Sequence, residues 1–189
     1  MGYLFFKKGN KSDTKTFNNS CDEAEKKQMI NVKLICTGTL KESYLRDAYA
    51  EYSKRLGGIC RFDMVELKEH KLGDSPSDNE IATALEDEGK KILSIFSASP
   101  RAYKIALCIE GKQLSSEELA AQLEAVAQTS SEIFLVIGSS YGLSDSVKKA
   151  CDMRLSVSKM TFPHQLMRII LLEAVYRAFS ITKGTKYHK

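Results

Sequence analysis

Closely spaced cysteine pairs are missing from this chain. Its five cysteines are scattered and form no CxxC motif: Cys21, Cys36, Cys60, Cys108 and Cys151. An odd, scattered set argues against a disulfide framework or a zinc site, and it fits a reducing cytoplasm. Cys36 and Cys108 lie in apolar runs and are predicted to be small core residues. No apolar run without charges is long enough to cross a bilayer, so we expect no membrane segment. Because the cysteines are scattered, we also expect no metal.

The common nucleotide-binding and hydrolase fingerprints are also missing. No GxGxxG opens a helix after the first predicted strand, and no GxxxxGK[ST] loop occurs, which disfavours dinucleotide enzymes and P-loop NTPases. Ser139 and Ser140 do not lie in a GxSxG elbow. With only three histidines, His70, His164 and His188, nothing in the sequence motivates a hydrolase triad.

The net charge of +4 is too small to mark a dedicated nucleic-acid module. Residues 1–29 hold six lysines and four acidic residues, and the remainder holds 22 basic and 20 acidic residues. If the chain acts on RNA, we expect it to depend on shape or on a structured partner instead of bulk charge.

Residues 1–29 are polar and rich in Lys, Asn and Ser. Their low hydrophobicity predicts an extension outside the fold, either disordered or non-native. Regular patterning begins at Ile30, directly after Met29. We therefore predict one domain over residues 30–189.

Apolar runs alternate with amphipathic stretches throughout that domain. Strands are predicted at 32–36, 62–67, 105–109, 133–137 and 155–157, and helices at 41–56, 78–96, 119–126, 144–151 and 166–181. Asp78 is a candidate N-cap, and Ser115 with Glu118 has capping-box spacing. Continuous apolar strands alternating with helices predict an α/β fold, a parallel sheet with helices on both faces.

Three loops follow the predicted strand ends, at 110–112, 138–142 and 158–162, and the first two contain glycine. Ligands bind outside the carboxyl ends of strands in open α/β sheets, and glycine lets a ligand approach the backbone. These loops are therefore the predicted ligand site, although small-residue turns after strands are common.

The last helix, starting near Pro163, is apolar almost all round. Such a helix must be covered on more than one side, either by a second subunit, which we favour, or by the rest of its own domain. Glu173 and Arg177 are spaced for an ion pair that either satisfies itself or orients a site. Arg154 and Arg168 are either phosphate contacts or surface charges, and His164 has either a capping or packing role or a functional one.

The basic, aromatic end of the chain, residues 186–189, is either a frayed terminus or an RNA-facing element. In the second case Tyr187 would stack on a base and His188 would handle a proton.

Three segments taken together resemble a known family: Ser158-Lys159-Met160-Thr161-Phe162-Pro163-His164-Gln165, Val175-Tyr176-Arg177-Ala178-Phe179 and Tyr187-His188-Lys189. They are similar to the bacterial RlmH family of large-subunit rRNA pseudouridine N3-methyltransferases. The resemblance runs from about Ile30 to the last residue and includes Gly57, the turn at 110–112 and Gly138. It implies a SPOUT-type fold whose C-terminal part threads a trefoil knot, a rare exception to ordinary topology.

The resemblance also implies an activity: methylation of a pseudouridine at N3 in 23S rRNA, on the assembled ribosome, with S-adenosylmethionine as cofactor. The implied cofactor-binding residues are Leu107, Gly138, Val157, Ser158, Lys159, Met160, Thr161 and Phe162. The alternatives are a SPOUT methyltransferase for another RNA and a non-catalytic ribosome-associated factor. Ser139 departs from the family, which has a second glycine there, and it would weaken cofactor binding if that position needs a bare backbone.

The implied catalytic residues are His188, Tyr187, Arg177 and Glu173. In the family the final residues complete the site of the partner subunit, which implies a homodimer. Attack by N3 requires loss of its proton, and His188 is the best candidate base because its ordinary pKa lies near neutrality. Arg177, oriented by Glu173, would stabilise charge developing on the base.

Overall fold

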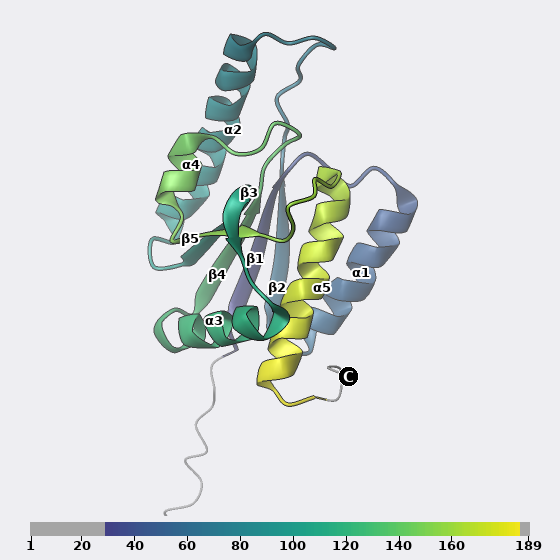
Figure 1. Cartoon of the computed structure of the whole chain (residues 1–189), viewed down its shortest axis with the longest axis vertical. Helices are drawn as coiled ribbons and strands as arrows, with labels where there is room; N and C mark the ends of the chain where they lie inside the picture. Colours follow the sequence, from purple (N-terminus) through teal and green to yellow (C-terminus); the bar gives the residue numbers. More distant parts are fainter. Residues whose placement is uncertain (1–28, 186–189) are drawn as a thin grey trace, which may run out of the picture.

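A computed structural model describes residues 29–185 as an alternation of five strands and five helices (Figure 1). The elements are β1 (Asn31–Thr37), α1 (Ser43–Gly57), β2 (Arg61–Leu67), α2 (Asp78–Ala98), β3 (Tyr103–Gln113), α3 (Ser116–Thr129), β4 (Glu132–Ile137), α4 (Asp145–Ala150), β5 (Met153–Ser156) and α5 (His164–Thr182). All ten elements occur in the predicted order. The predicted extension at 1–29 lies outside the described residues except for Met29.

The strands form one parallel sheet in the order β2-β1-β4-β3-β5. Helices α1, α3 and α5 cover one face, and α2 and α4 cover the other (Figure 1). β1 and β4 lie inside the sheet and are apolar because both of their faces are covered. This confirms the predicted α/β class, and the trefoil knot stays a prediction.

Alternating residues of the inner strands feed two separate cores, as the period of a β-strand requires. Leu34 of β1 and Leu135 of β4 face α1, α3 and α5, whereas Ile35 and Val136 face α2 and α4. Cys36 is fully buried, and burial raises the pKa of its thiol to about 12, so it behaves as a core residue as predicted.

The N-cap of helix α2 lies one residue before the predicted cap. Ser77, not Asp78, is the N-cap, and it forms a capping box with Glu80. A hydroxyl accepts from the N3 backbone while the N3 carboxylate accepts from the cap N–H, and the pair Ser77 and Glu80 has that spacing. The capping box predicted at Ser115 and Glu118 is confirmed. α4 is shorter than predicted and begins after Ser144.

The predicted loop at 110–112 is wrong, because β3 continues to Gln113 through a bulge. Leu107 and Lys112 both pair with Leu155 of β5, so the residues between them leave the ladder. A Cβ at Gly111 would lie 2.5 Å from the carbonyl carbon of Leu155, so only glycine lets the strand lie this close to β5. Cys108 lies in the bulge and is only half-buried, contrary to its predicted core role.

Arg168 was expected at the surface or on a phosphate, and both interpretations are wrong. Its side chain is fully buried. The guanidinium donates to Glu66 Oε1 at 2.9 Å and to the carbonyl oxygens of Thr37 and Gly38 at 2.8 and 3.1 Å. One side chain of α5 therefore holds the carboxyl ends of β1 and β2.

Within residues 29–185, no helix is long and apolar enough to cross a membrane.

Replacing Arg168 with alanine is predicted to lower the free energy of unfolding by about 3 kcal/mol or more, because buried carbonyl oxygens lose their donors. Urea denaturation measures the change. Arg154→Ala, at an exposed position of β5, is the matched control, with an expected change within about 0.5 kcal/mol. A loss at Arg168 no larger than that of the control would contradict the anchoring role.

Candidate functional site

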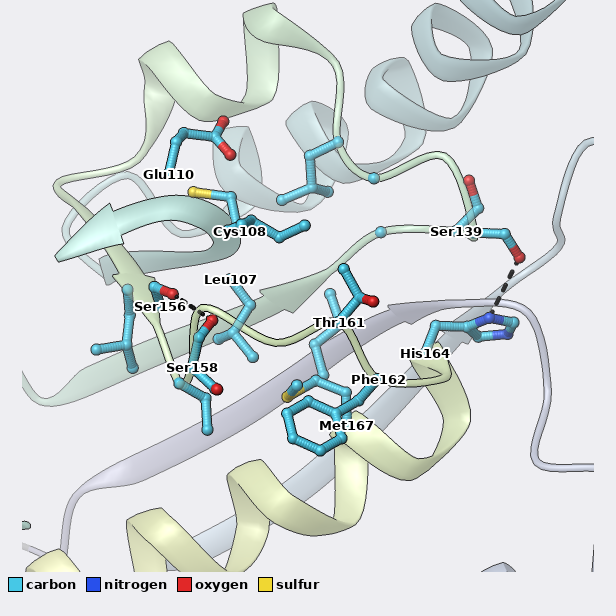
Figure 2. Close-up of a pocket in the computed structure, with 18 of the residues that line it drawn as sticks. Leu107, Cys108, Glu110, Ser139, Ser156, Ser158, Thr161, Phe162, His164 and Met167 are labelled. Atoms are coloured by element: carbon cyan, nitrogen blue, oxygen red, sulfur yellow. Dashed lines mark hydrogen bonds between the residues drawn. The ribbon is translucent and has the colours of Figure 1, made fainter. Parts of the chain in front are cut away.

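A pocket of about 430 Å³ lies at the carboxyl ends of β3, β4 and β5 (Figure 2). That volume is in the range of small-molecule sites. Cys108 and Glu110 line the side formed by the β3 bulge, and Phe162 and Met167 line the side next to α5 (Figure 2). The pocket is therefore at the sheet edge where the sequence predicted a ligand.

The loop after β4 turns back sharply onto itself. A Cβ at Gly138 would lie 1.9 Å from the carbonyl oxygen of Gly142, a distance that no side chain tolerates. Gly142 has a φ of +90°, and its N–H donates to the carbonyl of Ser139 at 2.9 Å. Glycine at both positions leaves the backbone bare along one wall of the pocket.

The loop between β5 and α5 is held by Ser156 and Ser158. Ser156 Oγ donates to the carbonyl of Ser158 at 3.0 Å, and Ser158 Oγ accepts from the N–H of Met160 at 3.0 Å. These two bonds hold the start of the loop against the end of β5. The rest of the loop continues past Thr161 and Phe162, which also line the pocket.

Glu110 and Lys148 form an ion pair of 2.7 Å at the pocket wall. The hydrogen bond from Lys148 lowers the pKa of the Glu110 carboxyl, with Arg154 adding a weaker electrostatic effect. Glu110 is therefore a carboxylate at neutral pH. It offers the pocket a group that accepts hydrogen bonds from hydroxyls or attracts a cation.

His164 joins the β4 loop to the start of α5, since its Nδ1 lies 3.3 Å from Ser140 Oγ (Figure 2). Burial lowers the pKa of His164, and the positive charge of Arg168 lowers it further. A neutral imidazole that bridges two pocket walls favours the packing role over a functional role for His164.

Seven of the eight predicted cofactor-binding residues line this pocket, and these seven are Leu107, Gly138, Val157, Ser158, Met160, Thr161 and Phe162. Lys159 is exposed and does not line it. Glu173 and Arg177 form the expected ion pair on α5, but they are not among the residues of this pocket. Tyr187 and His188 lie outside the described residues.

Sequence reasoning missed Tyr141 and Met167 as individual lining residues, although Tyr141 lies in one of the predicted loops. Met167 lies in a helix that is apolar almost all round, so its residue type gives no signal. Its position in the first turn of α5, next to the predicted loop at 158–162, is the only sequence feature that could have indicated a place in the pocket. Among residues 29–185, no group of three or more His, Cys, Asp or Glu could hold a metal ion.

The pocket fits S-adenosylmethionine in its chemistry. Apolar side chains such as Leu107, Val157 and Phe162 suit an adenine ring, and Glu110 suits ribose hydroxyls or an amino group. The tight turn at Gly138 lets a ligand approach the main chain directly. The side chain of Ser139 is buried at this wall, so the departure from the family's second glycine is accommodated within the fold.

A family model described as predicted SPOUT methyltransferase matches residues 30–188. The chain belongs to this SPOUT methyltransferase family. Proteins named ribosomal RNA large subunit methyltransferase H are similar to the chain over 161 residues, which is 85% of this chain and 100% of theirs. The identity is 48% for the protein of Streptococcus thermophilus strain LMD-9, 45% for that of Bacillus pumilus and 48% for that of Bifidobacterium adolescentis.

The chain also resembles solved structures, but more weakly, and two of these serve as examples. The tRNA (m1G37) methyltransferase of Aquifex aeolicus is 12% identical with a TM-score of 0.46, and the match covers 79% of this chain and 69% of that one. The SpoU methyltransferase AviRb of Streptomyces viridochromogenes, solved with AdoMet, is 12% identical with a TM-score of 0.42, and the match covers 83% and 62%. The family match itself confirms the predicted enzyme class, an S-adenosylmethionine-dependent methyltransferase.

Replacing Gly138 with alanine is predicted to weaken S-adenosylmethionine binding at least about tenfold, because the added methyl group forces the β4 loop away from its turn. Isothermal titration calorimetry measures the affinity. Gly57→Ala is the matched control, since a Cβ at Gly57 meets nothing within 4 Å. If the two variants bind S-adenosylmethionine with equal affinity, the β4 loop is not part of the cofactor site.

Proposed function

We propose that this protein methylates N3 of a pseudouridine in 23S rRNA on the assembled ribosome, in the cytoplasm, with S-adenosylmethionine as methyl donor. The observation that carries the proposal is the pocket at the strand ends, lined by seven residues that the RlmH resemblance assigns to the cofactor. The 48% identity to a protein named rRNA large subunit methyltransferase H, over that protein's full length, supports ribosomal RNA as the substrate.

We further propose that the active form is a homodimer. Leu166, Ile169, Ile170, Glu173 and Arg177 share one side of α5 at helical spacing, and none of them is buried. At the pocket rim Ile109 and Met160 are 62% and 68% exposed. Large apolar side chains gathered at one end of a small domain favour a covering partner.

The length of α5 supports a site shared between subunits. The helix runs from the pocket at Met167 to Thr182, a distance of about 22 Å. The described chain ends beside its last turn, where the N–H of Thr185 donates to the carbonyl of Ser180. Even a fully extended chain carries His188 only about 10 Å beyond Thr185. The tail therefore falls short of the pocket of its own chain, which favours a tail that serves the partner's pocket.

In the proposed chemistry the cofactor supplies an electrophilic methyl group. His188 from the partner accepts the proton of N3, so that the ring nitrogen becomes nucleophilic. Arg177, held by its ion pair with Glu173, stabilises the negative charge on the pyrimidine ring. Tyr187 stacks on a base and positions it.

Mixing two defective variants tests the shared site. Gly138→Ala impairs the donor pocket and His188→Ala impairs the tail, so each homodimer is expected to be nearly inactive. A mixed population is predicted to recover about a quarter of wild-type activity, because half of the dimers are mixed and each has one intact site. Labelled-methyl incorporation into ribosomes measures it. Recovery no greater than the sum of the two variants alone would show that each site lies within one chain.

A comparison of substrates tests the proposed reaction. Since residues 30–189 are close to neutral in charge, we expect transfer of labelled methyl to assembled ribosomes at least about tenfold faster than to free 23S rRNA. Mass spectrometry of the digested rRNA is predicted to place the methyl on N3 of a pseudouridine. Methylation of tRNA in preference to ribosomes would favour the alternative RNA, and no methylation of any RNA would favour a non-catalytic factor.

A further inference from the structure

A second cavity of about 310 Å³ lies beside the cofactor pocket. Its walls come from the loop after β2, the first half of α2 and the β4 loop. Ser139 and Tyr141 line both cavities, so the β4 loop is a wall that the two share. A group bound in the second cavity would therefore lie next to the site of methyl transfer.

The loop after β2 is fixed to α2 by three interactions. The N–H of His70 donates to Glu88 Oε1 at 2.9 Å, and Lys91 Nζ donates to the carbonyl of Lys68 at 2.9 Å. The ring of His70 also lies 3.6 Å from Asp87 Oδ2. These contacts between the loop after β2 and α2 hold two walls of the cavity in place.

Glu88 is the unusual group in this cavity, because its residue is only 4% exposed. Its Oε1 accepts from the N–H of His70, and a carboxylate has further lone pairs at Oε2 that can accept from a ligand in the cavity. A carboxylate at this wall disfavours a phosphate group and favours a ligand that brings an N–H donor.

The other walls suit a flat aromatic ring. Ile81, Ala84 and Leu85 of α2 provide apolar surface, and Tyr141, a residue that is 47% exposed, provides an aromatic ring. Bases that are turned out of an RNA loop are commonly stacked on aromatic side chains and read at their hydrogen-bonding edges. Lys71 also lines the cavity and could meet the phosphate that follows such a base.

We propose that this second cavity binds a nucleobase that flanks the methylated nucleotide, with Tyr141 stacking on it and Glu88 Oε2 accepting from its exocyclic amino group. Adenine, cytosine and guanine carry such a group. Uracil presents a ring N–H between two carbonyl oxygens, which the carboxylate repels. This inference rests on the proposed RNA substrate and names the part of the RNA that the cavity recognises.

Glu88→Gln is the direct test, since the amide oxygen can keep the bond from His70 and then turns its NH₂ toward the base, donor against donor. With ribosomes as substrate, KM is expected to rise about tenfold or more, with kcat and the affinity for S-adenosylmethionine nearly unchanged. Glu86→Gln, exposed on the same helix, is the matched control with no change. Tyr141→Ala, in an exposed loop position, should also raise KM for ribosomes, because the stacking ring is lost.

Ribosomes in which each flanking nucleotide is changed singly to uridine complete a double-mutant cycle. One change is expected to raise KM for the wild-type protein and to have little further effect on Glu88→Gln. An unchanged KM for Glu88→Gln, or additive effects at every flanking position, would overturn the proposal.

A separate arm keeps the two proposals distinguishable. Cytidine, adenosine, guanosine and uridine monophosphates are titrated into the full chain, and the NMR signal of the His70 amide is followed. At least one amino-bearing nucleotide is expected to shift it in the wild-type protein but not in Glu88→Gln, and uridine monophosphate should not. That result together with no methylation of ribosomes would contradict only the proposed function. No shift with any nucleotide would contradict the base site.

Discussion

The buried guanidinium of Arg168 joins the parts of the molecule on which the site depends. It lies on the first turns of α5 and donates to groups at the ends of β1 and β2. The same first turns of α5 carry His164 and Met167, which line the pocket at the strand ends. Because a buried charge must keep its partners, the start of α5 cannot shift away from the sheet edge without a large cost in free energy. The start of α5, which lines the pocket, is therefore held in a fixed position against the ends of β1 and β2.

Two places where main-chain segments lie unusually close together determine the shape of the pocket. Gly138 permits the β4 loop to fold back on Gly142, and Gly111 lets the β3 bulge lie against β5. Both are packing constraints, since a single added methyl group would collide with main-chain atoms. More than half of the side chains that line the pocket are apolar, and the ion pair of Glu110 and Lys148 lies at its wall. Apolar surface combined with hydrogen-bonding groups in a defined cavity is typical of small-molecule sites.

The order of the elements could be predicted because apolar patterning is a local signal, and β4 in particular has a continuous apolar run. The exact N-cap of α2 could not be predicted, because it depends on a choice between the adjacent polar residues Ser77 and Asp78. The bulge in β3 could not be predicted either, because it depends on pairing with β5, which is distant along the chain. Arg168 was misinterpreted for the same reason, since its partners Thr37 and Glu66 are more than 100 residues away. Resemblance to a family predicted eight cofactor-binding residues, seven of which line one pocket, whereas the cavity at Glu88 emerged only from the tertiary structure.

The central claim is that the pocket between the β3 bulge, the β4 loop and the start of α5 holds the methyl donor. A crystal structure of the full chain with S-adenosylhomocysteine tests it most directly, because the product of methyl transfer occupies the same site as the donor. The account predicts density for the ligand against Leu107, Gly138 and the loop at 156–162, with the C-terminal residues of a second subunit beside it. Ligand bound elsewhere on a monomer, with this pocket empty, would contradict it.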